Sequence, residues 1–126
     1  MYLLDTHALL WFLRDDPRLS PTARAIIISP ESVTLASSIS LWEIALKKNL
    51  GKLDFDYSIR DIARMCQEID IPLLAISPEE LDDLAALPFI HRDPFDRLII
   101  SQARTRNLTI ITRDSMIAKY DVRTLW

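Results

Sequence analysis

Short apolar segments recur along the chain, and longer stretches of mixed polarity separate them. Each apolar segment has the length of a buried strand. We predict strands at residues 2–4, 33–36, 73–76, 108–112 and 122–125.

Helices are predicted between these strands, because start signals and helical spacing fill the intervening stretches. Ser20-Pro21, Ser77-Pro78 and Asp93-Pro94 each place a capping side chain before a proline, which is typical of a first helical turn. The predicted helices cover 8–13, a segment from Pro21, 38–49 before Gly51, 59–69, a segment from Pro78 and a segment from Pro94. Short apolar strands that alternate with helices predict an α/β fold, in which helices cover both faces of a parallel sheet.

Length and composition indicate a single domain across residues 1–126, without repeats, linkers or low-complexity runs. Hydrophobic residues make up 49% and charged residues 26% of the chain, which excludes a disordered or fibrous protein. The single Cys66 cannot close an intrachain disulfide, and no apolar run approaches the length of a membrane span. We therefore expect a cytoplasmic protein that does not associate with membranes.

The charge balance and the glycine content exclude several function classes. Fifteen Lys and Arg against eighteen Asp and Glu give a net charge of −3, so nucleic acid would have to bind to a local basic patch. Gly51 is the only glycine, which excludes the dinucleotide-binding G-x-G-x-x-G motif, the P-loop and the G-x-S-x-G nucleophile motif. One Cys and two distant His provide no zinc-binding spacing.

Four acidic residues fall at the edge of the predicted sheet where ligands of such folds bind, beyond the carboxyl ends of the strands. Asp5 and Asp114 follow the first and fourth strands, Glu43 lies in the second turn of the helix after the second strand, and Asp96 lies in the first turn of the helix before the fourth. All four have apolar neighbours, whereas most other acids occupy polar stretches. We expect these four side chains to converge.

A cluster of four carboxylates needs protons or a cation, because carboxylates a few Å apart repel by about 4 kcal/mol per pair at an effective dielectric of 20. Ligands that are all oxygen suit Mg²⁺ or Mn²⁺, which also bind substrate phosphate. Such an ion activates water and stabilises a phosphodiester displacement. The acids therefore predict metal-dependent phosphodiester hydrolysis.

Over essentially its whole length the chain resembles PIN-domain nucleases, and especially the ribonuclease toxins of VapBC-type toxin–antitoxin modules. The resemblance rests on the order and spacing of four segments, at residues 3–13, 37–53, 91–103 and 108–114. It implies a doubly wound parallel sheet in the order 3-2-1-4-5, an endoribonuclease activity dependent on Mg²⁺ or Mn²⁺, a homodimer, and inhibition by a small antitoxin protein.

The resemblance also assigns roles to residues of this chain. It implies that the metal-binding and catalytic acids are Asp5, Glu43, Asp96 and Asp114. Thr6 and Ser38 match accompanying hydroxyl positions, and Thr112 occupies a position where the family often has Ser or Thr.

Each acid also has a purely structural interpretation. Asp5 suits the N-cap of the helix that follows it, and Ser40 with Glu43 matches the S-x-x-E capping box. Asp96 suits the first helical turn after Asp93, which we expect to be a cap, and Asp114 suits a turn. Convergence of the four on one sheet edge favours the functional interpretation.

The sequence neighbourhoods of other polar residues indicate what they do. His7 and His91 are expected to be structural rather than metal ligands. A local basic patch near the acids is predicted from Lys47, Lys48, Lys52, Arg92, Arg97 and Arg113. Of these we assign Arg97 and Arg113 to substrate binding, and a solvated helix face explains Lys47 and Lys48 equally well.

Two alternative functions compete with an RNA-cleaving toxin. A phosphorelay receiver domain has similar length and an acidic Mg²⁺ pocket, but it needs an acid at the end of the third strand and a Lys at the end of the fifth. The chain has Ile76-Ser77 and Arg123 in those regions. The second alternative is a PIN nuclease that processes RNA without an antitoxin, and the absence of an added RNA-binding module favours the toxin.

Overall fold

Five parallel strands form the centre of the molecule, and the computed structural model describes all of residues 1–126. The strands are β1 (Tyr2–Leu4), β2 (Thr34–Ser37), β3 (Leu73–Leu74), β4 (Thr109–Ile111) and β5 (Arg123–Leu125). They lie in the order β3-β2-β1-β4-β5, which confirms the predicted order. Leu4 of β1 is in register with Ala36 of β2 and Ile111 of β4, so the carboxyl ends of three central strands lie together at one edge.

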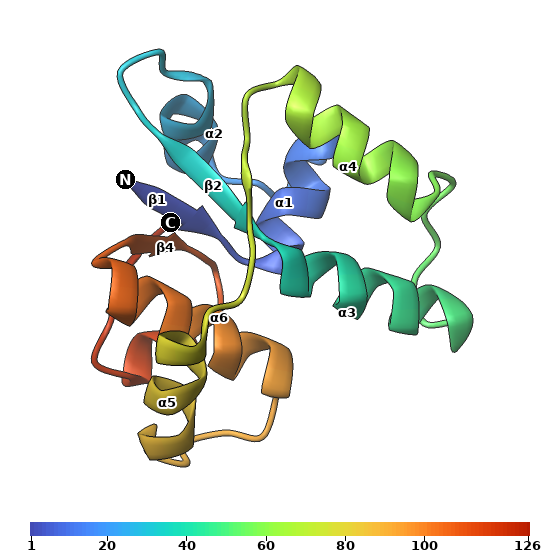
Figure 1. Ribbon diagram of the computed structural model, residues 1–126. Coiled ribbons are helices and arrows are strands. Elements are labelled where there is room, and N and C mark those ends of the chain that lie inside the picture. Colours follow the sequence, from blue (N-terminus) through green and yellow to red (C-terminus); the bar gives the residue numbers. More distant parts are fainter.

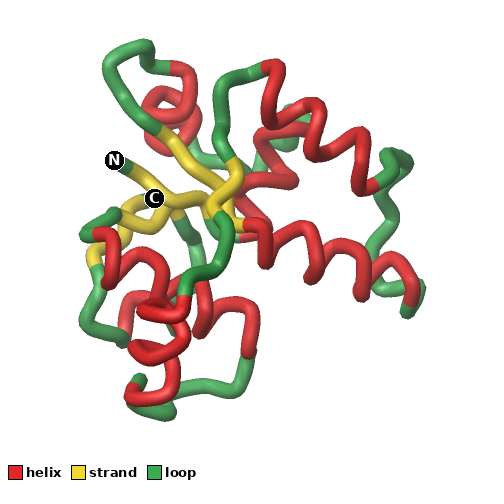
Figure 2. The backbone as a smooth tube through the Cα atoms, in the orientation of Figure 1, coloured by secondary structure: helices red, strands yellow, loops and turns green.

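Helices cover both faces of the sheet, as the alternation of strands and helices predicted (Figure 1). The helices are α1 (Thr6–Leu13), α2 (Pro21–Ile28), α3 (Ser38–Asn49), α4 (Ile59–Glu68), α5 (Pro78–Ala86), α6 (Pro94–Arg106) and the short 3₁₀ helix η1 (Ile117–Lys119). Figure 2 shows the strands between two groups of helices, with α1, α2 and α4 on one side and α5 and α6 on the other. None of these helices combines the length and the apolar composition that a membrane span requires.

The sheet separates two apolar cores because successive strand residues point to opposite faces. Leu4 packs in a core with residues of α1 and α4, whereas Leu3 packs in a second core with residues of α6. Both leucines are fully buried, and full burial of such a side chain contributes about 1.5–3 kcal/mol to stability. The two cores hold β1 firmly, and with it the residue that follows the strand.

Local signals determine where several helices begin and end. The side chains of Ser20, Ser77 and Asp93 accept hydrogen bonds from backbone N–H groups of the helices that follow, as predicted. Helix α3 ends before Gly51, whose φ of 68° is a backbone conformation that glycine adopts without strain. These caps set the helix boundaries close to the predicted ones.

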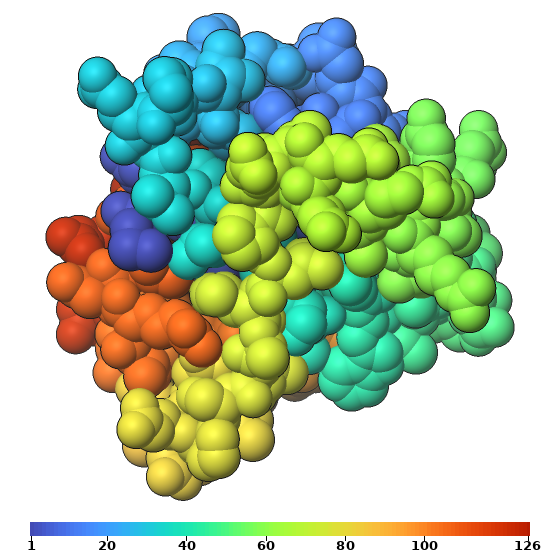
Figure 3. All heavy atoms as spheres, turned by 45° about the horizontal axis from the view of Figure 1, so that its top comes forward, coloured from blue at the N-terminus to red at the C-terminus, as the bar shows by residue number.

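The third strand is shorter than predicted. Residues 73–76 were expected to be extended, but only Leu73 and Leu74 pair, with Ala36 and Ser37 of β2. Strand β2 ends at Ser37 and turns into α3, so Ile76 has no strand to pair with. In Figure 3 the segment from α4 to α5 forms a continuous band across the surface.

Candidate metal-binding active site

Asp5 follows β1 directly and is the N-cap of α1. Its Oδ1 accepts a hydrogen bond of 2.8 Å from the Ala8 N–H, so the capping interpretation of Asp5 is confirmed. The cap uses only one carboxylate oxygen, because Oδ2 accepts a hydrogen bond from the Thr112 hydroxyl. Asp5 is 5% exposed and therefore lies beneath the surface at the sheet edge.

Glu43 lies within α3 and does not form a capping box. The N-cap of α3 is Ser37, so the interpretation that paired Glu43 with Ser40 as a capping box is wrong. The Oε1 atom of Glu43 instead accepts a hydrogen bond of 2.6 Å from the Thr6 hydroxyl, and Oε2 forms an ion pair with Lys47. Glu43 thus points toward the start of α1, where Asp5 is located.

Asp96 lies in the first turn of α6, where Asp93 is the helix cap. The Asp93 carboxylate accepts hydrogen bonds of 2.9 Å from the N–H groups of Phe95 and Asp96, which confirms Asp93 as a cap. The Asp96 carboxylate is free of this task and lies 3.1 Å from Nε2 of His91.

Asp114 follows β4 and is connected to Asp5 through Thr112. The Asp114 N–H donates a 3.0 Å hydrogen bond to Oγ1 of Thr112, and the same hydroxyl donates to Asp5. Asp114 also forms a turn, because its Oδ1 accepts a 2.8 Å hydrogen bond from the Met116 N–H. Thr112 therefore links two of the four acids, whereas the Asp114 residue is exposed to solvent.

Asp5 lies close enough to Glu43, Asp114 and Asp96 for their charges to act on one another. Burial raises the pKa of Asp5 from 3.8 to about 6, and the charges of Asp114 and Glu43 add to this increase. Burial likewise raises the pKa of Asp96 to about 6, with further increases from the charges of Asp93, Glu43 and Asp5. Ionisation of Asp5 and Asp96 at neutral pH therefore costs free energy in the folded protein.

The oxygen ligands of the four acids suit a hard divalent cation, although their side chains contact other groups of the protein. No group of three His, Cys, Asp or Glu residues has the geometry of an ion site as the side chains stand. The partners of the acids include the Lys47 ammonium and the Thr6 and Thr112 hydroxyls. Carboxylates that oppose each other's ionisation are ligands that Mg²⁺ or Mn²⁺ favours, so the residues fit such an ion in their chemistry.

A pocket of about 350 Å³ opens beside two of the acids. It is lined by Asp5, His7, Trp11, Arg18, Arg113 and Asp114. The Arg113 guanidinium lies 4.5 Å from the ring centre of Trp11, and the Arg18 guanidinium lies 5.1 Å from it. Larger hollows of about 630 and 460 Å³ lie beside α4 and beside the end of α6, away from all four acids.

Several predicted residues lie apart from the acids. Ser38 makes no side-chain hydrogen bond to them, and it is Ser40 that lies 2.9 Å from Thr6. Arg97 is buried, and its guanidinium donates to the main-chain carbonyl of Pro88 and to the Tyr120 hydroxyl. These contacts favour a structural role for Arg97 over the substrate-binding role that the sequence suggested.

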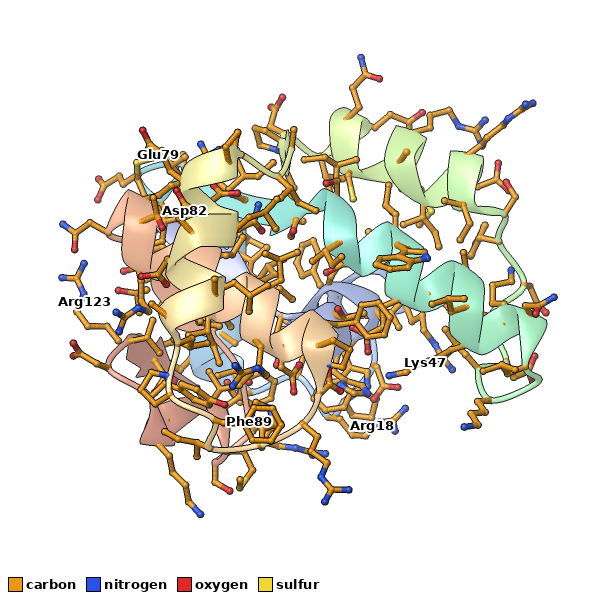
Figure 4. All side chains as sticks on the ribbon, turned by 60° about the horizontal axis from the view of Figure 1, so that its bottom comes forward. Arg18, Lys47, Glu79, Asp82, Phe89 and Arg123 are labelled. Carbon is orange, nitrogen blue, oxygen red and sulfur yellow. The ribbon has the colours of Figure 1, made fainter.

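The basic patch is also smaller than the sequence suggested. Lys48 donates to the main-chain carbonyls of Phe55 and Tyr57 and so holds the loop after α3. Lys47 of α3 and Arg18 of the loop after α1 project toward the same lower side of the molecule in Figure 4. Arg113 is exposed and lines the pocket beside Asp5 and Asp114.

Two residues near the acids were not assigned to the site from the sequence. His91 was expected to be structural, and it contacts Asp96 five positions later in the chain. Tyr120 lies 2.8 Å from the other ring nitrogen of His91, across 29 positions of the sequence. The spacing of His91 before Asp96 was visible in the sequence, but no local signal pointed to Tyr120.

Comparisons with known proteins agree with this fold. A model of the PIN domain family matches residues 2–123. No curated protein sequence matches the chain.

Among solved structures, VapBC2 from Rickettsia felis bound to a promoter DNA fragment is similar, with a TM-score of 0.74, 17% identity, and coverage of 98% of this chain and 96% of that chain. FitAcB from Neisseria gonorrhoeae has a TM-score of 0.70 and 19% identity, with coverage of 100% and 97%. A toxin–antitoxin complex from Klebsiella pneumoniae has a TM-score of 0.65 and 18% identity, also with coverage of 100% and 97%. At these identities the three structures establish the fold.

Proposed function

Because the chain belongs to the PIN domain family, we propose that it is a metal-dependent endoribonuclease and the toxin of a toxin–antitoxin module. One observation carries the nuclease proposal: Asp5 and Asp96 have pKa values raised to about 6 by burial and by the charges of neighbouring acids, at the carboxyl edge of the sheet. If these acids had only a structural role, enough hydrogen-bond donors would surround them to offset the effect of burial on their pKa values. A cation that neutralises the cluster explains why ionisable side chains occupy these buried positions.

Asp5, Glu43, Asp96 and Asp114 would hold Mg²⁺ or Mn²⁺. When bound, the ion supplies an activated water and stabilises the charge that develops on the phosphodiester. The side chains of this chain perform the remaining tasks. Thr112 orients the Asp5 carboxylate, and Thr6 orients Glu43.

Lys47 and Arg113 have different electrostatic tasks in this proposal. Lys47 offsets the charge of Glu43 when no cation is bound, because its ammonium forms an ion pair with Oε2. Arg113 rests on the face of Trp11 and makes no ion pair with an acid of the chain, so its N–H groups are free to bind an RNA phosphate at the pocket. Cleavage would then occur beside this pocket.

The nuclease activity is tested by incubating purified protein with a single-stranded RNA that contains a hairpin loop. We expect internal cleavage with Mg²⁺ or Mn²⁺ and none with EDTA. Asp5→Asn, which keeps the shape of the side chain and a capping oxygen, should remove the activity. Cleavage that persists in EDTA, or equal cleavage by Asp5→Asn, would reject the proposal.

The toxin role rests on the similar structures, one of which is a toxin–antitoxin complex. Under this proposal the protein acts in the cytoplasm, forms a homodimer and is inhibited by a small antitoxin protein. Expression in bacteria should arrest growth, Asp5→Asn should not, and the product of a neighbouring gene should relieve the arrest. Normal growth of cells that contain soluble, RNA-cleaving protein would reject the toxin role and leave the nuclease role intact.

A further inference from the structure

A chain of hydrogen bonds runs from a buried arginine to one of the four acids. Nη1 of Arg97 lies 3.0 Å from the Tyr120 hydroxyl oxygen, which lies 2.8 Å from Nδ1 of His91. Nε2 of His91 lies 3.1 Å from Oδ2 of Asp96. The chain joins the end of η1, the loop before α6 and the first turn of α6.

The number of donors around Tyr120 determines which nitrogen of His91 carries the proton. The Tyr120 oxygen accepts hydrogen bonds from Nη1 of Arg97 and, at 3.1 Å, from the backbone N–H of His91. Both lone pairs of the hydroxyl are then used, so its own proton must be donated, and Nδ1 of His91 is the remaining partner. Because Nδ1 accepts, the ring proton is on Nε2, which donates to Asp96.

We propose that His91, with its tautomer fixed by Tyr120 and Arg97, is a positioning residue that orients the Asp96 carboxylate for cation binding. This inference rests on the proposed function. The Nε2–H group of His91 holds Oδ2 of Asp96, and no protein group donates to Oδ1. One oxygen of the carboxylate is thereby fixed and the other is left for the ion.

The chemistry of the donor distinguishes this contact from a purely structural one. The start of α6 is already capped by Asp93, so the helix does not require a bond from His91 to Asp96. A neutral imidazole N–H orients a carboxylate without cancelling its charge. Lys47 beside Glu43, in contrast, is a cation that competes with a metal for the same oxygen.

Direct measurement of Mn²⁺ binding tests the proposal without RNA. The free Mn²⁺ signal in electron paramagnetic resonance is titrated against the full-length protein and its His91→Ala, His91→Gln and Tyr120→Phe variants. Loss of a group that orients a metal ligand typically weakens binding by about 10- to 100-fold, so we expect at least about a 10-fold loss for His91→Ala. His91→Gln retains an N–H donor near the position of Nε2 and should recover most of the affinity.

The Tyr120→Phe variant tests the tautomer, because the ring of His91 loses the donor that assigns its proton to Nε2. We expect a weakening of Mn²⁺ binding between those of His91→Gln and His91→Ala. Ile62→Val, in the core on the other face of the sheet, is the control for lost stability. It should lower the melting temperature and leave Mn²⁺ binding unchanged.

Three outcomes would overturn the inference. If His91→Ala binds Mn²⁺ like the parent protein, His91 is only structural. If His91→Gln binds as weakly as His91→Ala, the Nε2–H donor is not the reason for the effect. If the parent protein itself binds no Mn²⁺, the proposed function fails together with this inference.

Discussion

Two buried glutamates of the same chain are held in opposite ways. Glu80 is 0% exposed and Glu43 is 2% exposed, so both side chains are buried. Glu80 accepts hydrogen bonds from the Ser77 N–H at 2.9 Å, from Gln102 at 3.1 Å and from Arg106 at 2.6 Å. Burial opposes the ionisation of Glu80, but the bonds from Ser77, Arg106 and Gln102 overcome it and lower the pKa.

The surroundings of Glu43 are different because they contain further acids. Lys47 is its only basic partner, and the charge of Glu43 contributes to the raised pKa values of Asp5 and Asp96. The helix that contains Glu80 lies away from this cluster, as the positions of Glu79 and Asp82 relative to Lys47 show in Figure 4. The protein itself neutralises the charge of Glu80. It does not supply enough positive charge to neutralise the acidic cluster. Buried carboxyls with raised pKa values therefore distinguish a candidate site from a structural ion pair.

The largest difference between the two regions is expected in catalysis. Asp5→Asn removes a carboxylate that the cation needs, so RNA cleavage in Mg²⁺ should fall by at least about 10³-fold. In EDTA at neutral pH the variant should unfold at the same temperature as the parent or higher, because a costly buried charge has been removed. Cleavage rates and thermal unfolding of both proteins provide the check. A variant that melts much lower would instead indicate that the ionised Asp5 carboxylate stabilises the fold and is not a costly buried charge.

Glu80→Gln should show the reverse pattern. The substitution leaves Arg106 without its counter-charge, and we expect a loss of about 1–3 kcal/mol in the free energy of unfolding. Cleavage at a temperature where the variant is folded should match the parent. Urea unfolding monitored by circular dichroism measures the loss. A large decrease in cleavage by folded Glu80→Gln would contradict the separation of the two regions.

The two regions should also respond oppositely to pH in the absence of metal. The folded-state pKa values of Asp5 and Asp96 are raised to about 6, so between about pH 4 and 6 the folded protein holds protons that the unfolded chain releases. Each of the two carboxyls should lose roughly 2–3 kcal/mol of its contribution to stability as pH rises through this window. Glu80 has a lowered pKa, so its contribution is present above the unfolded pKa and is lost as pH falls through the folded value.

Asp5→Asn supplies the control for this pH dependence. Denaturant unfolding in EDTA at pH 4.5 and at pH 7 should show a smaller difference for Asp5→Asn than for the parent protein. An equal difference would show that Asp5 does not titrate in this window.

The smallest effect is expected when the positive charge beside Glu43 is removed. Lys47→Met removes the cation that pairs with Glu43, so Mn²⁺ should bind about three-fold more tightly, in line with the modest strength of a partly exposed ion pair. Isothermal titration calorimetry measures this change. Lys119→Met, an exposed lysine of η1 without an ion pair, is the matched control. Weaker Mn²⁺ binding by Lys47→Met would mean that Lys47 supports the ion site rather than competing with it.

The sequence predicted the features that depend on local patterns. Apolar segments and helix caps indicated the strands and the starts of the helices, and the carboxyl edge of a parallel sheet predicted where Asp5 and Asp114 would lie. Long-range side-chain contacts were beyond such patterns. The partner of Glu43 is Thr6, 37 positions earlier, and the capping-box match with Ser40 was a local alternative that the fold did not use. The contact between Arg97 and Tyr120 escaped the sequence for the same reason, because Tyr120 lies 23 positions later.

The location of a bound cation tests the distinction between the two regions most directly. A crystal of the protein soaked in Mn²⁺ would be measured at a wavelength where manganese scatters anomalously. We predict an anomalous peak among the carboxylates of Asp5, Glu43, Asp96 and Asp114, with the Lys47 ammonium moved away from Glu43. A fully soaked crystal with no peak at these four acids, or with a peak only elsewhere, would contradict the claim that a cation completes the acidic cluster.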